Sequence, residues 1–214
     1  MAYIFTENEY TVVQLPMVEV REEGEVKEEE VELVLDASGK VVKGPYATVQ
    51  EALDKALDNL AKALREAESL LDKLEYRLET EEKVDPGEVY TTSYMAHQLH
   101  YTAIQLYATA KGLLQRGFIR HRPYYQARRL LRKAYMVRRY ARDVRLLYAS
   151  IIQLSLDISI KKLTWLGTVA TPAVVITSFY GMNLSWLPAA DNPPLVFLIL
   201  AASTALFAYV INKI

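Results

Sequence analysis

"FYGMNLSWLP", residues 179–188, separates two long apolar runs in the last third of the chain. No Lys, Arg, Asp or Glu occurs in residues 163–182 or in residues 192–212. A helix rises about 1.5 Å per residue, so about 20 apolar residues cross a hydrocarbon layer of about 30 Å. We therefore predict two membrane-spanning helices joined by a short hairpin; the alternative is a pair of buried core helices.

The average composition hides this division. Charged residues make up 24% of the 214 residues and the net charge is −1, values typical of a soluble protein. Acidic residues gather in residues 19–36 and 50–82, and arginines in residues 116–145. The chain has no cysteine, which excludes disulfides, thiolate metal sites and cysteine nucleophiles. The first ten residues lack a basic segment and an apolar segment, so we expect no signal peptide.

Lysines flank the apolar runs on one side only. Lys161 and Lys162 precede the first run and Lys213 follows the second, whereas the connection carries only Asp191. Positive flanks stay in the cytoplasm. We expect a multi-pass protein of the cell membrane with both termini cytoplasmic and the Gly-Met-Asn turn outside.

The part before residue 163 predicts a small sheet followed by helices. Short β-type pieces lie within residues 10–45. From Thr48, a capping residue with Glu51 three positions later, apolar residues recur at alternating steps of four and three, which is typical of a coiled coil. This seam comprises Leu53, Leu57, Leu60, Leu64, Ala67, Leu71, Leu74 and Leu78. "DPG" at residues 85–87 is expected to end this helix.

Two further helices complete the expected architecture. A helix over residues 89–115 would stop at Gly117, and one over residues 123–180, beginning at Pro123 and about 85 Å long, would continue into the first span. The fold class is thus a mainly α membrane protein with a small N-terminal β element. The predicted parts are a β-rich cytoplasmic element (1–46), a helical hairpin (47–121), a stalk helix with the first span (122–182), an external loop (183–193) and the second span (194–214).

"TPAVVITSFYGMN", residues 171–183, resembles the signature of the CorA family of divalent-metal transport proteins. In that family a proline precedes the Gly-Met-Asn turn by the interval that separates Pro172 from Gly181. The aromatic before the glycine matches Tyr180, and the aromatic-x-Pro turn matches Trp186 and Pro188. The order of sheet, hairpin, stalk, turn and second span agrees as well.

The resemblance implies a funnel-like homopentamer that conducts hydrated divalent cations, Mg²⁺ first and Co²⁺ or Ni²⁺ as further cargo. Gly181, Met182 and Asn183 would form the selectivity filter. Mg²⁺ holds its water tightly, so a ring of Asn183 amide oxygens would accept hydrogen bonds from the hydration shell. Gly181 would permit the close backbone turn; the alternative is that Asn183 only caps a helix.

The resemblance also places constrictions twelve, twenty and twenty-three residues before Asn183. Those positions are Thr171, Leu163 and Ile160, and helical spacing adds Gly167, Val174 and Ser178 to the same face. Ile160 and Leu163 would form an apolar collar that closes by dewetting. Asp157, one turn below, is either an acidic ring that attracts cations or a solvated stalk residue.

Several positions depart from the family pattern. Ser185 and Ala189 stand where the family's outer loop usually carries glutamates, which predicts weaker capture of cations or altered selectivity. Against the family pattern, the sequence ends at "INKI" without basic residues beyond Lys213, and we expect a short N-terminal domain. No regulatory metal site is carried over.

The arginine-rich residues 116–145 are open to three interpretations: nucleic-acid binding, membrane-surface binding, or pairing with the acidic segments of the same assembly. We favour pairing and expect no nucleic-acid partner. His97 and His100 share a helix face without a carboxylate in register, so we expect a polar surface rather than a metal site.

No phosphate-binding loop or nucleophile–base arrangement occurs, so we expect no enzyme and no cofactor besides the transported cation. Flow would be passive, with the membrane potential contributing roughly 4–5 kcal/mol per 100 mV for a divalent ion. The alternatives are a zinc transporter of the same family and a non-conducting membrane-anchored coiled-coil scaffold.

Overall fold

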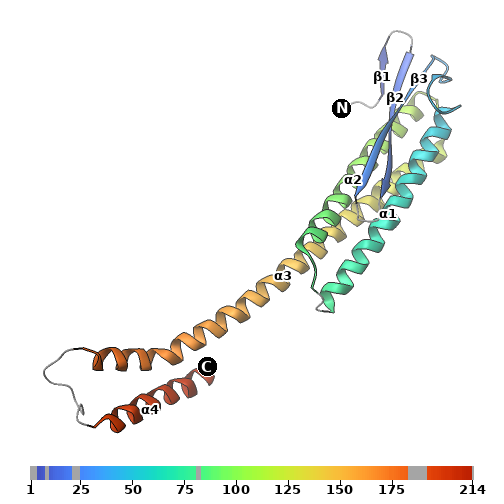
Figure 1. Ribbon diagram of the computed structural model, residues 1–214. Helices are drawn as coiled ribbons and strands as arrows, with labels where there is room; N and C mark the ends of the chain where they lie inside the picture. The colour runs from blue at the N-terminus through green and yellow to red at the C-terminus, as the bar shows by residue number, and fades with distance from the viewer. Residues whose placement is uncertain (1–3, 8–9, 21–24, 81–82, 183–191, 214) are drawn as a thin grey trace. The chain divides into compact units, whose positions relative to one another are not determined.

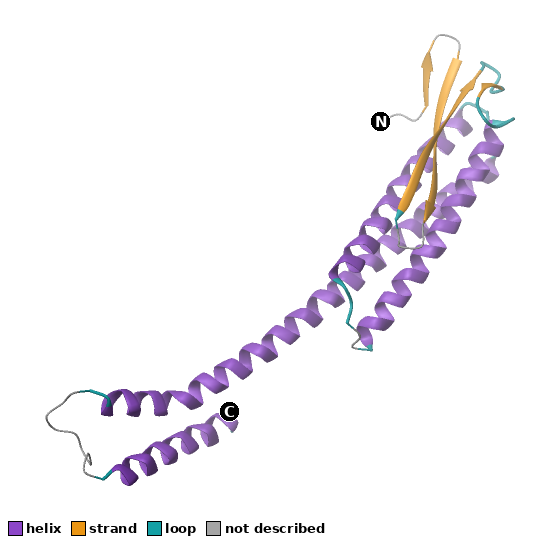
Figure 2. Cartoon of the chain, in the orientation of Figure 1, coloured by secondary structure: helices purple, strands orange, loops and turns teal. Residues whose placement is uncertain are grey.

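The computed structural model describes residues 4–7, 10–20, 25–80, 83–182 and 192–213. These residues form four strands and four helices. Figure 1 labels all of them except β4, and Figure 2 colours them by type. The chain divides into two compact units, Met1–Ala149 and Ser150–Ile214. Each unit has its own character: the first has a hydrophobic core, and the second is helical and apolar on its surface.

An antiparallel sheet in the order β1-β2-β3-β4 occupies the first unit. Its strands are β1 (Ile4–Glu7), β2 (Tyr10–Val20), β3 (Val26–Leu35) and β4 (Val41–Lys43). The sequence indicated β2, the second half of β3, and β4; β1 and the acidic start of β3 were not predicted, because glutamates are unusual in strands. Pro16 is tolerated in β2 because, in the described part of the chain, β1 pairs only with residues 10–13 and no described residue continues that ladder to Pro16.

Helix α1 (Val49–Glu79) begins as the sequence predicted. Thr48 is the N-cap, and its hydroxyl oxygen accepts a hydrogen bond from the Glu51 amide at 3.1 Å. Every residue of the predicted seam is buried. The helix ends at Thr80, before "DPG", and Pro86 instead opens the next helix, where its missing N–H costs nothing.

Helix α2 (Pro86–Gln115) stops at Gly117, as expected. Gly117 has φ +76°, the left-handed conformation that glycine adopts without strain. The Phe118 amide donates to the Leu113 carbonyl at 3.0 Å, and the Gly117 amide donates to that of Leu114, which completes a Schellman motif.

Helix α3 (His121–Tyr180) is unbroken over 60 residues, which confirms the expected continuity with the first span. It begins two residues before Pro123, which sits in the first turn, where its missing N–H removes no intrahelical bond. Its buried residues all lie in the first half and, from Ala127 on, repeat at steps of three and four. They are Pro123, Ala127, Leu130, Ala134, Val137, Ala141 and Val144.

Polar contacts tie this half of α3 to α1. The Tyr140 hydroxyl donates to Asp72 at 2.9 Å and also bonds Glu75, and Lys133 pairs with Glu68 at 2.7 Å. The acidic helix therefore does pair with the basic one, as predicted. The pairing groups are a lysine and a tyrosine; among the described residues, no arginine of α3 forms an ion pair with α1.

The second unit comprises the rest of α3 and helix α4 (Pro193–Asn212). Both helices are long and apolar enough to cross a membrane. Large apolar side chains on them, including Leu163, Leu166, Phe197 and Leu198, are more than half exposed. A surface of this kind is stable in lipid and unfavourable in water.

Candidate ion pathway

The end of α3 is the start of the proposed filter. Asn183, like the rest of residues 183–191, lies outside the described residues. Gly181 donates its amide to the Thr177 carbonyl at 2.9 Å, and Met182 donates to the Phe179 carbonyl at 3.3 Å, so the last turn tightens as the helix ends. A side chain at position 181 would place its Cβ 3.2 Å from the Thr177 oxygen. That close approach leaves little room for a side chain at this position.

Half-buried residues mark one face of α3 in the second unit. They are Thr168, Val169, Pro172, Ala173, Ile176 and Tyr180. Steps of three and four keep these positions on a single stripe. Helix α4 has a matching half-buried stripe at Val196, Leu200, Ser203, Thr204 and Ala208. In the described part of this unit α4 is the other helix, so we assign the two stripes to each other.

The predicted pore stripe occupies the other side of α3. Its members are Asp157, Ile160, Leu163, Gly167, Thr171, Val174 and Ser178, and all of them are exposed in the single chain. At about 100° per residue, the stripe from Ile160 to Ser178 lies roughly half a turn from the one assigned to α4. Within this chain, nothing in the described residues covers it. The sequence pattern did not reveal the stripe toward α4, although the small residues at positions 168–173 are a usable signal for close helix packing.

The hydroxyl groups of the span bond to their own helix. Thr168 donates to the Thr164 carbonyl, Thr171 to that of Gly167 and Thr177 to that of Ala173, each at 2.8 Å. Lipid offers no hydrogen-bond partner, so internal bonds of this kind keep the polar groups satisfied. Thr171 lies on the pore stripe, and because its proton points to the backbone, its oxygen presents lone pairs outward.

Pro172 interrupts the backbone ladder of α3 next to this stripe. Proline has no N–H, so the Thr168 carbonyl loses the donor that an ordinary residue at position 172 would supply. The helix nevertheless continues for eight residues to Tyr180. The missing hydrogen bond at Pro172 is a local weak point in the backbone hydrogen bonding of α3, between Gly167 and Gly181.

No cluster of three or more His, Asp or Glu side chains with metal-binding geometry occurs among the described residues. One carboxylate pair, Asp54 and Asp58, lies one turn apart on α1 in a hollow of about 640 Å³ that Arg122 and Arg129 also line. Burial, and then the neighbouring Asp58 carboxylate, raise the pKa of Asp54. The amide of Gln126 already donates to Asp58 at 3.3 Å. Two carboxylates beside two arginines make a poor cation site.

The comparisons with known proteins agree with this architecture. The family model described as "CorA-like Mg2+ transporter protein" matches residues 22–213, nearly the whole chain. The chain belongs to the CorA-like Mg²⁺ transporter family. Among solved structures, the CorA magnesium transporter from Methanocaldococcus jannaschii matches with a TM-score of 0.67 and 17% identity, over 98% of this chain and 77% of that one. No curated protein matches.

Membership of the CorA-like family places the chain among divalent-cation transport proteins of membranes. The resemblance predicted from residues 171–183 is thereby confirmed. The likeness to the archaeal transporter supports the fold: a small sheet, a long helix and two candidate spans. The ion, the filter and the number of subunits are matters for the proposal that follows.

Proposed function

We propose that this chain conducts hydrated divalent cations, with Mg²⁺ as the main cargo, as a homopentamer in the cell membrane. One stripe of α3 from each subunit would line the pore, and the Asn183 amides would form the outer ring. Both termini would lie in the cytoplasm, because Lys161, Lys162 and Lys213 flank the candidate spans on one side.

The observation that carries this proposal is the two-faced character of α3. A span that served only as an anchor would need no face distinct from its lipid-exposed surface. Here the side opposite the stripe assigned to α4 carries Gly167, Thr171 and Ser178, small or polar residues suited to a water-filled path. Polar groups within a span favour the bundle interior or a wet cavity over lipid.

The chemistry of this face suits a hydrated cation. Thr171 donates its proton to the Gly167 carbonyl and leaves oxygen lone pairs to accept from water. A hydrated Mg²⁺ presents only water protons to its surroundings, because the metal holds the oxygens. Acceptors therefore bind its outer shell without removing a water molecule, and an anion, whose shell presents oxygen, finds fewer partners.

The exposed apolar residues of α3 support an assembly of several chains. Leu154, Leu156 and Ile160 lie between the core of the first unit and the lysines at the base of the span, and each is more than half exposed. Other copies of the same helix would cover them. Ile160 and Leu163 would then form the predicted collar, and a bend near Pro172 offers one way of widening it.

The test is Mg²⁺ uptake into liposomes that contain the purified full chain. Asn183→Ala is expected to lower the flux by at least about tenfold, a loss equivalent to about 1.4 kcal/mol of stabilisation in the filter. Asn192→Ala is the matched control, since it removes the same amide at the start of α4, and its flux should stay near wild type.

Equal flux in wild type and Asn183→Ala would remove the filter role. An oligomer that is well folded but conducts no Mg²⁺, Co²⁺ or Ni²⁺ would favour the scaffold, and selective Zn²⁺ uptake would favour the zinc transporter. Size measurement of the detergent-solubilised particle decides the subunit number: a monomer or dimer contradicts the pore.

A further inference from the structure

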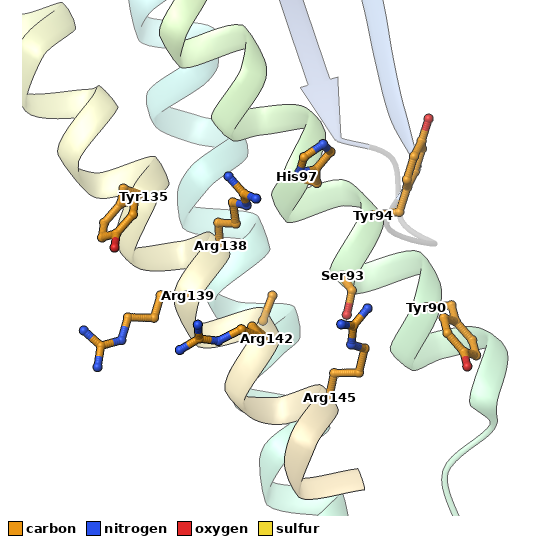
Figure 3. A pocket seen from close by; sticks show the side chains of 10 residues that line it. Tyr90, Ser93, Tyr94, His97, Tyr135, Arg138, Arg139, Arg142 and Arg145 are labelled. Carbon is orange, nitrogen blue, oxygen red and sulfur yellow. The ribbon is translucent and has the colours of Figure 1, made fainter. Parts of the chain in front are cut away.

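A groove of about 800 Å³ lies between α2 and α3 in the first unit, away from the proposed pore stripe. Figure 3 shows its side chains, which come from both helices. They are Tyr90, Ser93, Tyr94, His97, Tyr135, Arg138, Arg139, Ala141, Arg142 and Arg145. Among the described residues, the lining includes four arginines and no carboxylate, and the volume is in the range of small-ligand sites.

The positive charge of this groove is largely uncompensated. Among the described residues, Arg142 pairs with Asp143 at 3.2 Å, but Arg139 and Arg145 make no ion pair with a carboxylate. Arg138 approaches another basic group, the Nδ1 atom of His100, at 3.4 Å. Burial, followed by the charges of Arg138 and His97, lowers the pKa of His100. The described part of the chain thus supplies little negative charge to the four arginines that line the groove.

The groove offers two kinds of contact in one place. Guanidinium groups bind phosphate oxygens through paired N–H donors. Tyr90, Tyr94 and Tyr135 are 65%, 64% and 56% exposed and present flat aromatic faces beside the arginines. A ligand with several phosphates would neutralise the arginines, and an aromatic base on the same ligand would stack on a tyrosine.

The outer face of α1 on a second copy is a weaker candidate occupant. Its exposed charged residues that do not bond to α3 have both signs: Glu51, Lys55, Lys62, Arg65, Glu66, Lys73 and Glu79. Docking that face would bring lysines toward the arginines and cost electrostatic energy. A small multivalent anion carries no such opposing charge. We infer that the groove between α2 and α3 binds a polyphosphate anion, either inorganic or the phosphate chain of a nucleotide.

Calorimetric titration of the purified full chain in detergent, with EDTA present to remove divalent cations, tests this inference. One arm uses inorganic triphosphate and the other uses ATP. Each is expected to bind at one site per chain, and raising the salt concentration should weaken binding because the contacts are ionic. Tyr94→Ala should weaken the binding of ATP but not of triphosphate if the base stacks on Tyr94, and the binding of neither ligand if it does not. The first result would indicate a nucleotide and the second an inorganic polyphosphate.

The variant Arg138→Gln/Arg145→Gln should weaken triphosphate binding by about tenfold or more, since it removes two guanidinium contacts. The matched control is Arg128→Gln/Arg132→Gln, which makes the same charge change at exposed positions of α3 outside the groove. Its affinity should change less than about twofold. Circular dichroism and elution volume establish that both variants are folded. The variant Arg138→Lys/Arg145→Lys keeps the positive charge but not the paired N–H donors, so its triphosphate affinity separates the two contributions.

Four results would overturn the inference. The first is that wild type shows no saturable binding of either soluble ligand, and the second is that binding weakens equally in the groove and control variants. The third is binding only to anionic phospholipid vesicles, which would make the groove a lipid site. The fourth is a changed oligomer size in the groove variant without polyphosphate binding, which would make the groove a contact between copies. None of these bears on Mg²⁺ flux, so this inference and the transport proposal fail independently.

Discussion

Before residue 145, α3 buries a regular apolar seam against other elements of the first unit, whereas after it α3 buries no residue of any kind. Polar side chains follow the same division. Tyr140 and Lys133 bond to carboxylates of α1, while Thr168, Thr171 and Thr177 bond to carbonyls of their own helix. One helix thus serves two surroundings. In water its polar groups link neighbouring helices, and in the candidate span they satisfy themselves, as lipid requires.

Truncating one leucine in each half is the strongest challenge to this comparison. Leu130 is 5% exposed and Leu163 is 71% exposed. Leu130→Ala should lower the free energy of unfolding by about 2–5 kcal/mol, because it opens a cavity in the core. Leu163→Ala should change it by less than about 1 kcal/mol while raising Mg²⁺ leak through the collar. Thermal unfolding followed by circular dichroism, with flux in liposomes, measures both; equal losses of stability would break the comparison.

Adding one methyl group at two glycines sharpens the account of the candidate span. A Cβ at Gly181, where the helix ends, would lie 3.2 Å from the Thr177 oxygen, whereas at Gly167, inside the helix, it would meet no described atom within 4 Å apart from the backbone of its own helix. Gly181→Ala should lower Mg²⁺ flux by roughly tenfold through a displaced filter, and Gly167→Ala by less than about twofold. A larger effect at Gly167 would mean that the neighbouring subunit, rather than the chain's own backbone, sets the limit.

Hydroxyl groups provide a third contrast. Tyr140→Phe leaves the Asp72 and Glu75 carboxylates without this donor and should cost about 1–2 kcal/mol of stability. Thr177→Val removes a hydroxyl that bonds only to its own helix and should change stability by less than about 0.5 kcal/mol. Chemical denaturation of the two variants in parallel measures the difference, and a greater loss for Thr177→Val would show that the span's hydroxyls also join helices.

The smallest effect concerns pH. Burial, Arg138 and His97 hold the pKa of His100 below its ordinary value of 6.5. The unfolded chain therefore binds a proton at His100 more readily than the folded chain does. As a result, protonation of His100 leaves the free energy of unfolding unaffected above pH 6.5 and lowers it as the pH drops below that value. His100→Gln should reduce the slope of stability against pH below pH 6.5. An unchanged slope would assign the dependence to other groups.

The sequence predicted the helices well because their signals are local. The seam from Leu53 to Leu78, the Thr48 cap and the Gly117 stop each depend on side chains within a few residues. The strands were less predictable: β1 and the glutamate-rich start of β3 owe their conformation to pairing with β2, which short-range pattern does not encode.

The expected pore stripe could be listed from the family resemblance and helical spacing, but neither could say which side of α3 faces α4. That information depends on packing between two helices whose sequences are apolar all round. The basic groove was likewise beyond prediction. The arginine run was plain in the sequence, yet the sequence suggested acidic partners, and only the placement of α2 beside α3 shows which arginines those partners do not reach.

The exposed side chains Leu146, Ile151, Ile152, Leu154, Leu156, Ile158 and Ile160 have a thermodynamic consequence. If other copies cover them, folding and association are linked by mass action, and the melting temperature rises with protein concentration. Dilution would then act as a denaturant, and stabilities of two variants are comparable only at a fixed amount of subunit per micelle.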